Sequence, residues 1–117
     1  MSADRRRVAV TGLGLVTPVG NDVGRTWQAL LAGAGGGREI SLFDASGFPV
    51  HIAAEVKDFE LAAPVGRKLL KYANRSHRFA LEAAEQALAD AGIRPTAYPF
   101  TAAISACISA AIESGMM

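Results

Sequence analysis

The chain opens with a strand-like run that ends in a glycine turn. Residues 6–20 read RRVAVTGLGLVTPVG, in which the apolar segment Arg7–Thr11 leads directly into Gly12 and Gly14. A continuous apolar strand of this kind is usually covered on both faces, as in parallel or mixed α/β sheets. The opening therefore predicts a buried strand followed by a tight passage of the backbone.

The two glycines raise the question of a dinucleotide site. That fingerprint needs GxGxxG at the start of a helix, so that the pyrophosphate sits on the helix N-terminus. Here Thr17 stands at the third glycine position and Pro18 follows at once, so no helix begins before about Asn21. The spacing favours a structural role for Gly12 and Gly14 over nucleotide binding.

A first helix is expected after the turn, with Asn21 or Asp22 as its N-cap. Gly33 ends it, ahead of the flexible run Gly35–Gly37. One stripe of this helix is apolar, formed by Val23, Trp27, Leu30 and Leu31.

The strongest periodic signal predicts a long helix over Asn74–Ala91, stopped by Gly92. Its apolar stripe is built mostly of alanines, which let a helix lie close to its neighbour, so we expect it to be buried in a layered core. Arg78 and Glu82 are four residues apart on the other side, where they would pair weakly. The stripe consists of Phe79, Ala83, Ala84, Ala87, Leu88 and Ala91.

The other segments give weaker signals. Ile40–Phe48 is rich in turn residues and is expected to be irregular, Val50–Val56 is a plausible strand, and Lys68–Lys71 could begin a helix. Ala102–Ile108 is predicted to be a second core strand. The order strand, helix, small strand, helix, strand indicates an α/β fold.

Composition narrows the class of protein. Half of the 117 residues are hydrophobic, which suggests a chain that belongs to a larger body or to an oligomer. The net charge of +1 does not indicate the positively charged surface that nucleic-acid-binding proteins use. The apolar stretch Phe100–Ile112 is too short, and too often interrupted by serine and threonine, to span a membrane. A single cysteine excludes an intrachain disulfide and fits a reducing cytoplasm.

Few residues are candidates for chemistry. His51 and His77 lack Cys, Asp or Glu at metal-ligand spacing, so a surface or capping role is expected for each. Cys107 lies in a run of small apolar residues, which is typical of an inert, buried thiol. No histidine, cation or helix N-terminus that would activate it as a nucleophile is evident in the sequence.

Several segments together resemble the β-ketoacyl-[acyl carrier protein] synthases, the elongating condensing enzymes of type II fatty acid or polyketide synthesis. The resemblance covers nearly the whole chain in order. Its segments are RRVAVTGLGLVTPVGNDV, TWQALLAG, FDASGFPVHIAAEVKDF, ALEAAEQALADAG and AAISACIS.

The resemblance implies the fold and the activity of the complete enzyme. The fold would be the N-terminal part of a thiolase-like layered αβαβα fold, incomplete in this chain, and the enzyme would be a homodimer. Such enzymes load an acyl chain from acyl carrier protein onto a cysteine, decarboxylate a malonyl group and join the two. They need no metal or organic cofactor beyond the carrier's phosphopantetheine arm.

Residues 1–117 resemble only the opening part of such an enzyme, and the family's nucleophilic cysteine and two histidines lie further along. We therefore assign no catalytic residue in this chain. Its segment AAISACIS matches the family's glycine-rich AAIGSGIG, which places Cys107 on a glycine and Ile108 on the family's isoleucine. The resemblance implies that both residues line the acyl pocket, where a bulkier wall should shorten the accepted chain.

Two hypotheses follow. In the first, the chain is an N-terminal portion of a condensing enzyme and is inactive alone, because nucleophile and bases must lie within hydrogen-bond reach of one another. In the second, it is a non-catalytic module that pairs with a partner subunit through the same fold segment.

Overall fold

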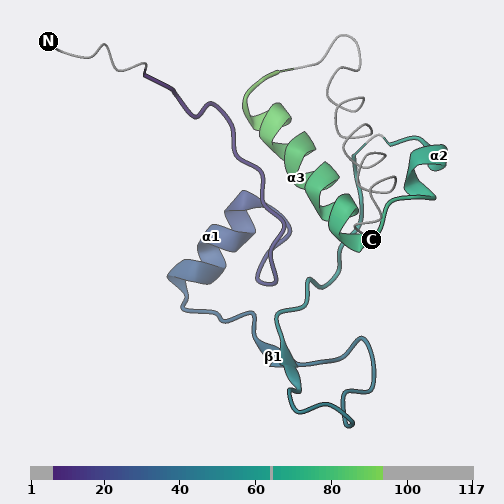
Figure 1. Cartoon of the computed structure of the whole chain (residues 1–117). Coiled ribbons are helices and arrows are strands. Elements are labelled where there is room, and N and C mark those ends of the chain that lie inside the picture. Colours follow the sequence, from purple (N-terminus) through teal and green to yellow (C-terminus); the bar gives the residue numbers. More distant parts are fainter. Residues whose placement is uncertain (1–6, 64, 94–117) are drawn as a thin grey trace, which may run out of the picture.

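The computed structural model describes residues 7–63 and 65–93, which form three helices and one pair of short strands (Figure 1). In chain order the elements are α1 (Val23–Leu31), β1 (Arg38–Glu39), β2 (Ile52–Ala53), α2 (Arg67–Leu70) and α3 (Arg75–Asp90). The predicted mixture of helix and strand is confirmed. The predicted strand Ala102–Ile108 lies outside the described residues.

Helix α1 begins and ends where the sequence predicts. Asp22 is its N-cap, with extended backbone and a side-chain oxygen that accepts from the N–H of Arg25 at 2.7 Å. Gly33 has a φ of 68° and donates its N–H to the carbonyl of Leu30, so the left-handed residue that closes the helix is a glycine.

Helix α3 also begins and ends where the sequence predicts. Asn74 caps it by accepting from the N–H of His77, while the His77 ring accepts from the N–H of Asn74, a reciprocal capping box. Gly92 follows the last turn with a φ of 67°. The capping role expected for His77 is confirmed, and the short helix α2 occupies most of the predicted Lys68–Lys71 segment.

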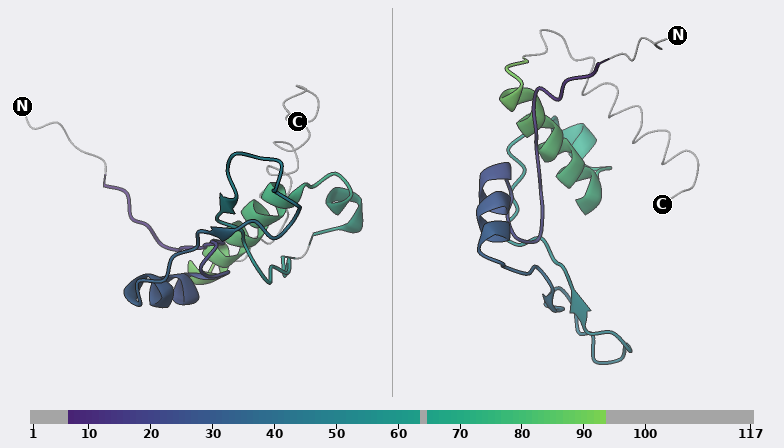
Figure 2. Two further views of the ribbon diagram at one scale, coloured as in Figure 1. Left: turned by 90° about the horizontal axis from the view of Figure 1, so that it is seen from below. Right: turned by 90° about the vertical axis from the view of Figure 1, so that its left-hand side faces the viewer.

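The strand predicted over Val50–Val56 is much shorter than expected. Only Ile52 and Ala53 belong to it, paired antiparallel with Glu39 and Arg38 of a strand that the sequence did not reveal. The loop between them is irregular, as predicted, and carries an edge-to-face contact between Phe43 and Phe48. Figure 2 shows this hairpin standing away from the helices.

The predicted opening strand, Arg7–Thr11, is extended but belongs to no sheet. A strand needs a neighbour to accept and donate its backbone hydrogen bonds, and the part of the chain described here supplies none for this segment. Val8 and Val10 are accordingly 90% and 80% exposed, not buried. The strand prediction is therefore wrong for these residues as they stand in the structure.

Beyond this segment the backbone runs along α3 (Figure 2). A Cβ on Gly12 would lie 2.7 Å from the amide nitrogen of Ala91, and one on Gly14 would lie 2.7 Å from that of Ala87. Real Cβ contacts are longer than this, so only glycine fits at either position. The structural role predicted for the two glycines is confirmed, because they let an extended chain touch a helix backbone.

Little of the described chain is buried. Its buried apolar residues are Ala45, Ala73 and Leu81, and no side chain in the described ranges is less than 2% exposed. The apolar stripe predicted on α3 is only half-buried, and the buried residue of this helix, Leu81, lies outside that stripe. The described residues therefore do not form the buried layered core that was expected around α3.

Candidate functional site

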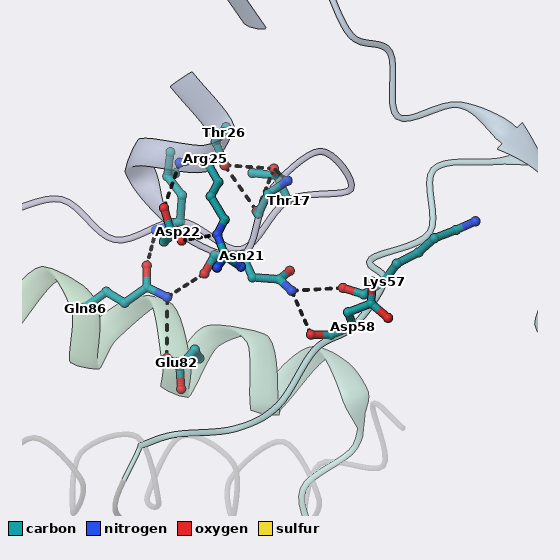
Figure 3. A network of polar contacts seen from close by, with 11 residues as sticks. Thr17, Asn21, Asp22, Arg25, Thr26, Lys57, Asp58, Glu82 and Gln86 are labelled. Atoms are coloured by element: carbon teal, nitrogen blue, oxygen red, sulfur yellow. Dashed lines mark hydrogen bonds and ion pairs between the residues drawn. The ribbon is translucent and has the colours of Figure 1, made fainter. Parts of the chain in front are cut away.

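Polar side chains of the glycine turn, α1 and α3 meet the backbone carbonyls of Lys57 and Asp58, which follow β2 (Figure 3). We call this cluster the polar junction. It consists of Thr17, Asn21, Asp22, Arg25, Thr26, Lys57, Asp58, Glu82 and Gln86.

Thr17 and Thr26 fix the glycine turn on α1. The backbone N–H of Thr17 donates to the Gly20 carbonyl at 2.8 Å, and the N–H of Gly20 donates back at 3.2 Å. The hydroxyls of Thr17 and Thr26 lie 3.1 Å apart, and each also donates to the Gly20 carbonyl. Thr26 is only 5% exposed, and its buried hydroxyl is hydrogen-bonded.

Asn21 joins the start of α1 to the segment after β2. Its side-chain amide donates to the carbonyl of Lys57 at 2.9 Å and to that of Asp58 at 3.0 Å. Asp58 has a φ of 49°, a left-handed conformation that costs free energy in a residue other than glycine. The amide of Asn21 therefore holds a strained backbone in place.

Three side chains at four-residue intervals on α3 bind backbone groups of other segments. Gln86 accepts from the N–H of Leu15 and donates to the carbonyl of Asn21, and Asp90 accepts from the N–H of Leu13 at 2.9 Å. Glu82, one turn before Gln86, accepts from the N–H groups of residues 62 and 63 at 2.8 and 3.0 Å. One face of α3 thus satisfies backbone donors that have no sheet partner.

The weak pair predicted between Arg78 and Glu82 does not form. Arg78 donates instead to the carbonyls of Ala73 and Leu70. Glu82 is engaged by the backbone before α2, and two backbone N–H donors satisfy a carboxylate better than one mobile guanidinium at an exposed position.

The junction borders an open depression with a volume of about 580 Å³. Arg25 is the single cation of its lining, and the Arg25–Asp22 ion pair at 3.4 Å is exposed. The lining residues are Asn21, Asp22, Arg25, Asp58, Phe59, Glu60, Glu82 and Gln86.

This lining contains no cysteine, histidine or hydroxyl nucleophile beside a base, which is the arrangement that acyl transfer would need. Within the described ranges no cluster of three or more His, Cys, Asp or Glu side chains could hold a metal ion. The hydrogen bonds from Asn21 to Lys57 and Asp58, and from Gln86 to Asn21, make the polar junction a structural joint between segments. Sequence reasoning identified Asn21 and Asp22 only as possible helix caps, and the four-residue spacing of Glu82, Gln86 and Asp90 was the signal that it missed.

A second polar contact closes the base of the hairpin. Glu55 accepts from the hydroxyl of Ser41 at 2.6 Å and from the N–H groups of Ser41 and Leu42. The Ser41 hydroxyl, followed by these backbone donors and the nearby charge of Lys57, holds the pKa of Glu55 below its ordinary 4.5. The Asp44 side chain accepts from the N–H of Ser46 within the loop, and hydrogen bonds from the backbone and side chain of Ser46 hold the pKa of Asp44 below its ordinary value.

The residues predicted to line an acyl pocket, Cys107 and Ile108, lie outside the described residues. His51 is exposed on the hairpin, as expected, with its backbone carbonyl accepting from Ile40 at 2.8 Å. None of the helices in the described ranges is both long and apolar enough to cross a bilayer.

Comparison with known proteins gives a consistent result. The family model described as "Beta-ketoacyl synthase, N-terminal domain" matches residues 5–116. The 3-oxoacyl-[acyl-carrier-protein] synthase 2 of Coxiella burnetii is 49% identical over 90 residues, which are 77% of this chain and 22% of that protein. The tetracenomycin polyketide synthase ketoacyl synthase beta subunit of Streptomyces glaucescens is 47% identical over 88 residues, 75% of this chain and 22% of that protein.

A solved structure agrees with the sequence matches. The ishigamide ketosynthase/chain length factor superposes with a TM-score of 0.68 at 38% identity, over 77% of this chain and 22% of that one. The chain thus spans about a fifth of the length of the proteins it matches, and its partial α/β fold is that of the N-terminal part of a thiolase-like ketosynthase.

Proposed function

Because the chain belongs to the β-ketoacyl synthase family, we propose that it forms the opening part of the scaffold of a decarboxylating condensing enzyme. The enzyme would join an acyl group, carried on a cysteine, to a malonyl unit held on acyl carrier protein. The observation that supports this most is the family match over residues 5–116. The relatives include both fatty-acid-type and polyketide-type synthases, so the proposal names the reaction and leaves the pathway open.

In this proposal residues 1–117 supply scaffold and no catalytic group. Gly12 and Gly14 let the opening segment lie against α3, and Gln86 of α3 hydrogen-bonds to Leu15 of that segment and to Asn21 before α1. The nucleophilic cysteine and the two histidines would come from the larger part of the enzyme, which follows the matched segment. Cys107 and Ile108 are proposed to line the acyl pocket, and acyl carrier protein is the proposed partner of a homodimer.

A condensation assay tests the proposal. The purified chain, mixed with acyl-loaded and malonyl-loaded acyl carrier proteins, should give no product above a blank without protein. The same residues joined in one polypeptide to the part of the Coxiella burnetii relative that follows its matched stretch should release carbon dioxide and form the β-ketoacyl product. Turnover by the isolated chain, or its absence in a joined protein that folds and dimerises, would contradict the proposal.

A second candidate function is a non-catalytic subunit paired with a ketosynthase. It is favoured by two relatives whose names contain "beta subunit" and "chain length factor". In that case the joined protein would be inactive alone and would gain activity only with a ketosynthase partner. Size-exclusion chromatography and circular dichroism of the isolated chain give a second test. A chain that is compact and unfolds cooperatively would favour this non-catalytic module.

A further inference from the structure

The hairpin of β1 and β2 has no hydrogen bond to any other segment of the described chain. Within the described ranges, every hydrogen bond of residues 38–55 stays inside the hairpin, from the β1–β2 pairing to the contact of Ser41 with Glu55. Figure 2 shows the hairpin projecting from the helices. Its orientation is therefore set by two legs, residues 34–37 before it and residues 56–58 after it.

The first leg contains a glycine that no contact requires. Gly36 lies against the glycine turn, where a Cβ would be 2.7 Å from the Cβ of Pro18. Gly35 has no left-handed φ, and a Cβ on it would meet nothing within 4 Å. What glycine contributes at position 35 is backbone freedom. Hinges are a few loop residues that absorb changes in φ and ψ, and Gly35 is suited to that role.

The second leg is held by side chains that bind three successive carbonyls. Arg75, at the start of α3, donates to the carbonyl of Val56. The Asn21 amide donates to the carbonyls of Lys57 and Asp58 at 2.9 and 3.0 Å. The φ of 49° at Asp58 costs free energy in this leg. Since side-chain donors can rotate away, the leg is fastened by contacts that can be released without breaking a helix or a strand.

The base of the hairpin also has space beside it. It borders an open depression of about 420 Å³, whose lining includes Glu55 of the hairpin and Arg75 and Phe59 from the other side of the second leg. Glu55 and Arg75 carry opposite charges, so an approach of the hairpin base to α3 across this depression is electrostatically favourable.

We propose that residues 38–55 form a strap that pivots about Gly35 and residues 56–58, and that the Asn21 amide is its latch. With the amide bound to Lys57 and Asp58, the strap stands open as in Figure 2. When the amide releases, Asp58 leaves its left-handed conformation and the strap moves across the depression toward α3. Gln86 of α3 donates to the carbonyl of Asn21 at 2.8 Å, so α3 positions the latch. This inference does not depend on the proposed function.

Double electron–electron resonance of the whole chain tests the strap. Nitroxide labels replace the exposed residues Gln28 of α1 and Ser46 of the hairpin loop, attached through a ketone-bearing amino acid so that the cysteine is unaltered. Asn21→Ala removes both latch donors and should raise the population of other strap orientations about fivefold, which broadens the distance distribution. Gly35→Ala stiffens the first leg and should narrow the distribution, alone and in combination with Asn21→Ala.

Two variants are matched controls. Gly47→Ala adds a Cβ that meets nothing within 4 Å, inside the hairpin and away from its legs. Glu85→Ala removes an exposed side chain of α3. Both should leave the distribution unchanged. Equal effects of variants and controls, or a wild-type distribution already as broad as that of Asn21→Ala, would overturn the inference.

Hydrogen exchange separates pivoting from unfolding of the strap. The N–H of Ile40 donates to the carbonyl of His51 inside the hairpin at 2.8 Å. Its protection should be the same in the wild type and in Asn21→Ala if the strap moves as one unit. Loss of this protection together with the broader distribution would mean that the hairpin melts, and the hinge would be rejected.

Discussion

Gly14 lies directly against the backbone of Ala87, so closely that a Cβ at Gly14 would be 2.7 Å from the Ala87 amide nitrogen and would overlap the Ala83 carbonyl. Both obstacles are helix backbone, which cannot rotate aside as a side chain can. The contact fixes how closely the backbone of the opening segment approaches the backbone of α3. The hydrogen bonds from Leu13 and Leu15 to α3 depend on that approach.

Gly14→Ala is therefore expected to separate the opening segment from α3 and to destabilise the fold by about 1–3 kcal/mol. Thermal unfolding followed by circular dichroism measures the loss. Gly47→Ala is the matched control, because a Cβ there meets nothing within 4 Å and the residue has no positive φ. Equal melting temperatures for the two variants would show that the segment does not rest on the helix.

Asn21→Asp should be more harmful than Asn21→Ala. Alanine removes two donors and costs about 1 kcal/mol. A carboxylate instead faces the carbonyl oxygens of Lys57 and Asp58, which now lie 2.9 and 3.0 Å from the donor nitrogen, and repels both. Amide hydrogen exchange of residues 56–59 reports the effect, and the reverse order of the two variants would contradict the assigned hydrogen bonds.

Asp58→Gly should stabilise the chain by roughly 0.5 kcal/mol, because glycine adopts a φ of 49° without steric cost. The gain is reduced by the greater freedom of glycine in the unfolded chain. Lys57→Gly is the control at the neighbouring position, which has no positive φ, and it should destabilise. Urea unfolding compares the two, and a loss of stability in Asp58→Gly would mean that the Asp58 side chain contributes more than its backbone strain costs.

The hairpin should loosen in acid. The pKa of Glu55 is lowered in the folded chain, so its contribution is complete above the ordinary value of 4.5 and is lost as the pH falls through the lowered value. NMR of the Ser41 and Leu42 amides during acid titration reports this change. Ser41→Ala removes the largest cause of the shift and should bring the titration of Glu55 back toward 4.5, whereas Glu55→Gln should abolish the pH dependence of both amides.

Cys107→Gly should lengthen the acyl chain that the complete enzyme accepts, since it restores the smaller residue of the family's glycine-rich segment. One methylene of pocket space is worth roughly tenfold in kcat/KM, so competition between acyl carrier proteins loaded with chains of different length is a sensitive measurement. Cys107→Ser, similar in size, serves as the control. An unchanged chain-length preference in Cys107→Gly would contradict the proposal that Cys107 lines the acyl pocket.

Both long helices could be predicted closely because their signals are local. Asp22, Asn74, Gly33 and Gly92 act on the backbone within one turn of themselves, and no distant contact is needed for a cap to form. Of the two strand predictions that the described residues test, one failed and the other was too long, for the opposite reason. Residues 7–11 have strand-forming side chains, yet a strand exists only beside a partner, and the length of β2 was decided by pairing with Arg38 and Glu39.

The polar junction could not be predicted from the sequence either. Asn21 and Gln86 are ordinary polar residues at their positions, and nothing local shows that one donates to Lys57 and Asp58 while the other bridges Leu15 and Asn21. The sequence by itself determined the family, the helix ends and the need for glycine near residues 12–14, because each follows from residue identity at a fixed spacing. Only the tertiary structure decided that α3 replaces a sheet partner for Leu13 and Leu15 and that the apolar stripe of α1 faces outward. Those outcomes depend on which segments meet in space, and that is set by contacts between residues up to 77 positions apart.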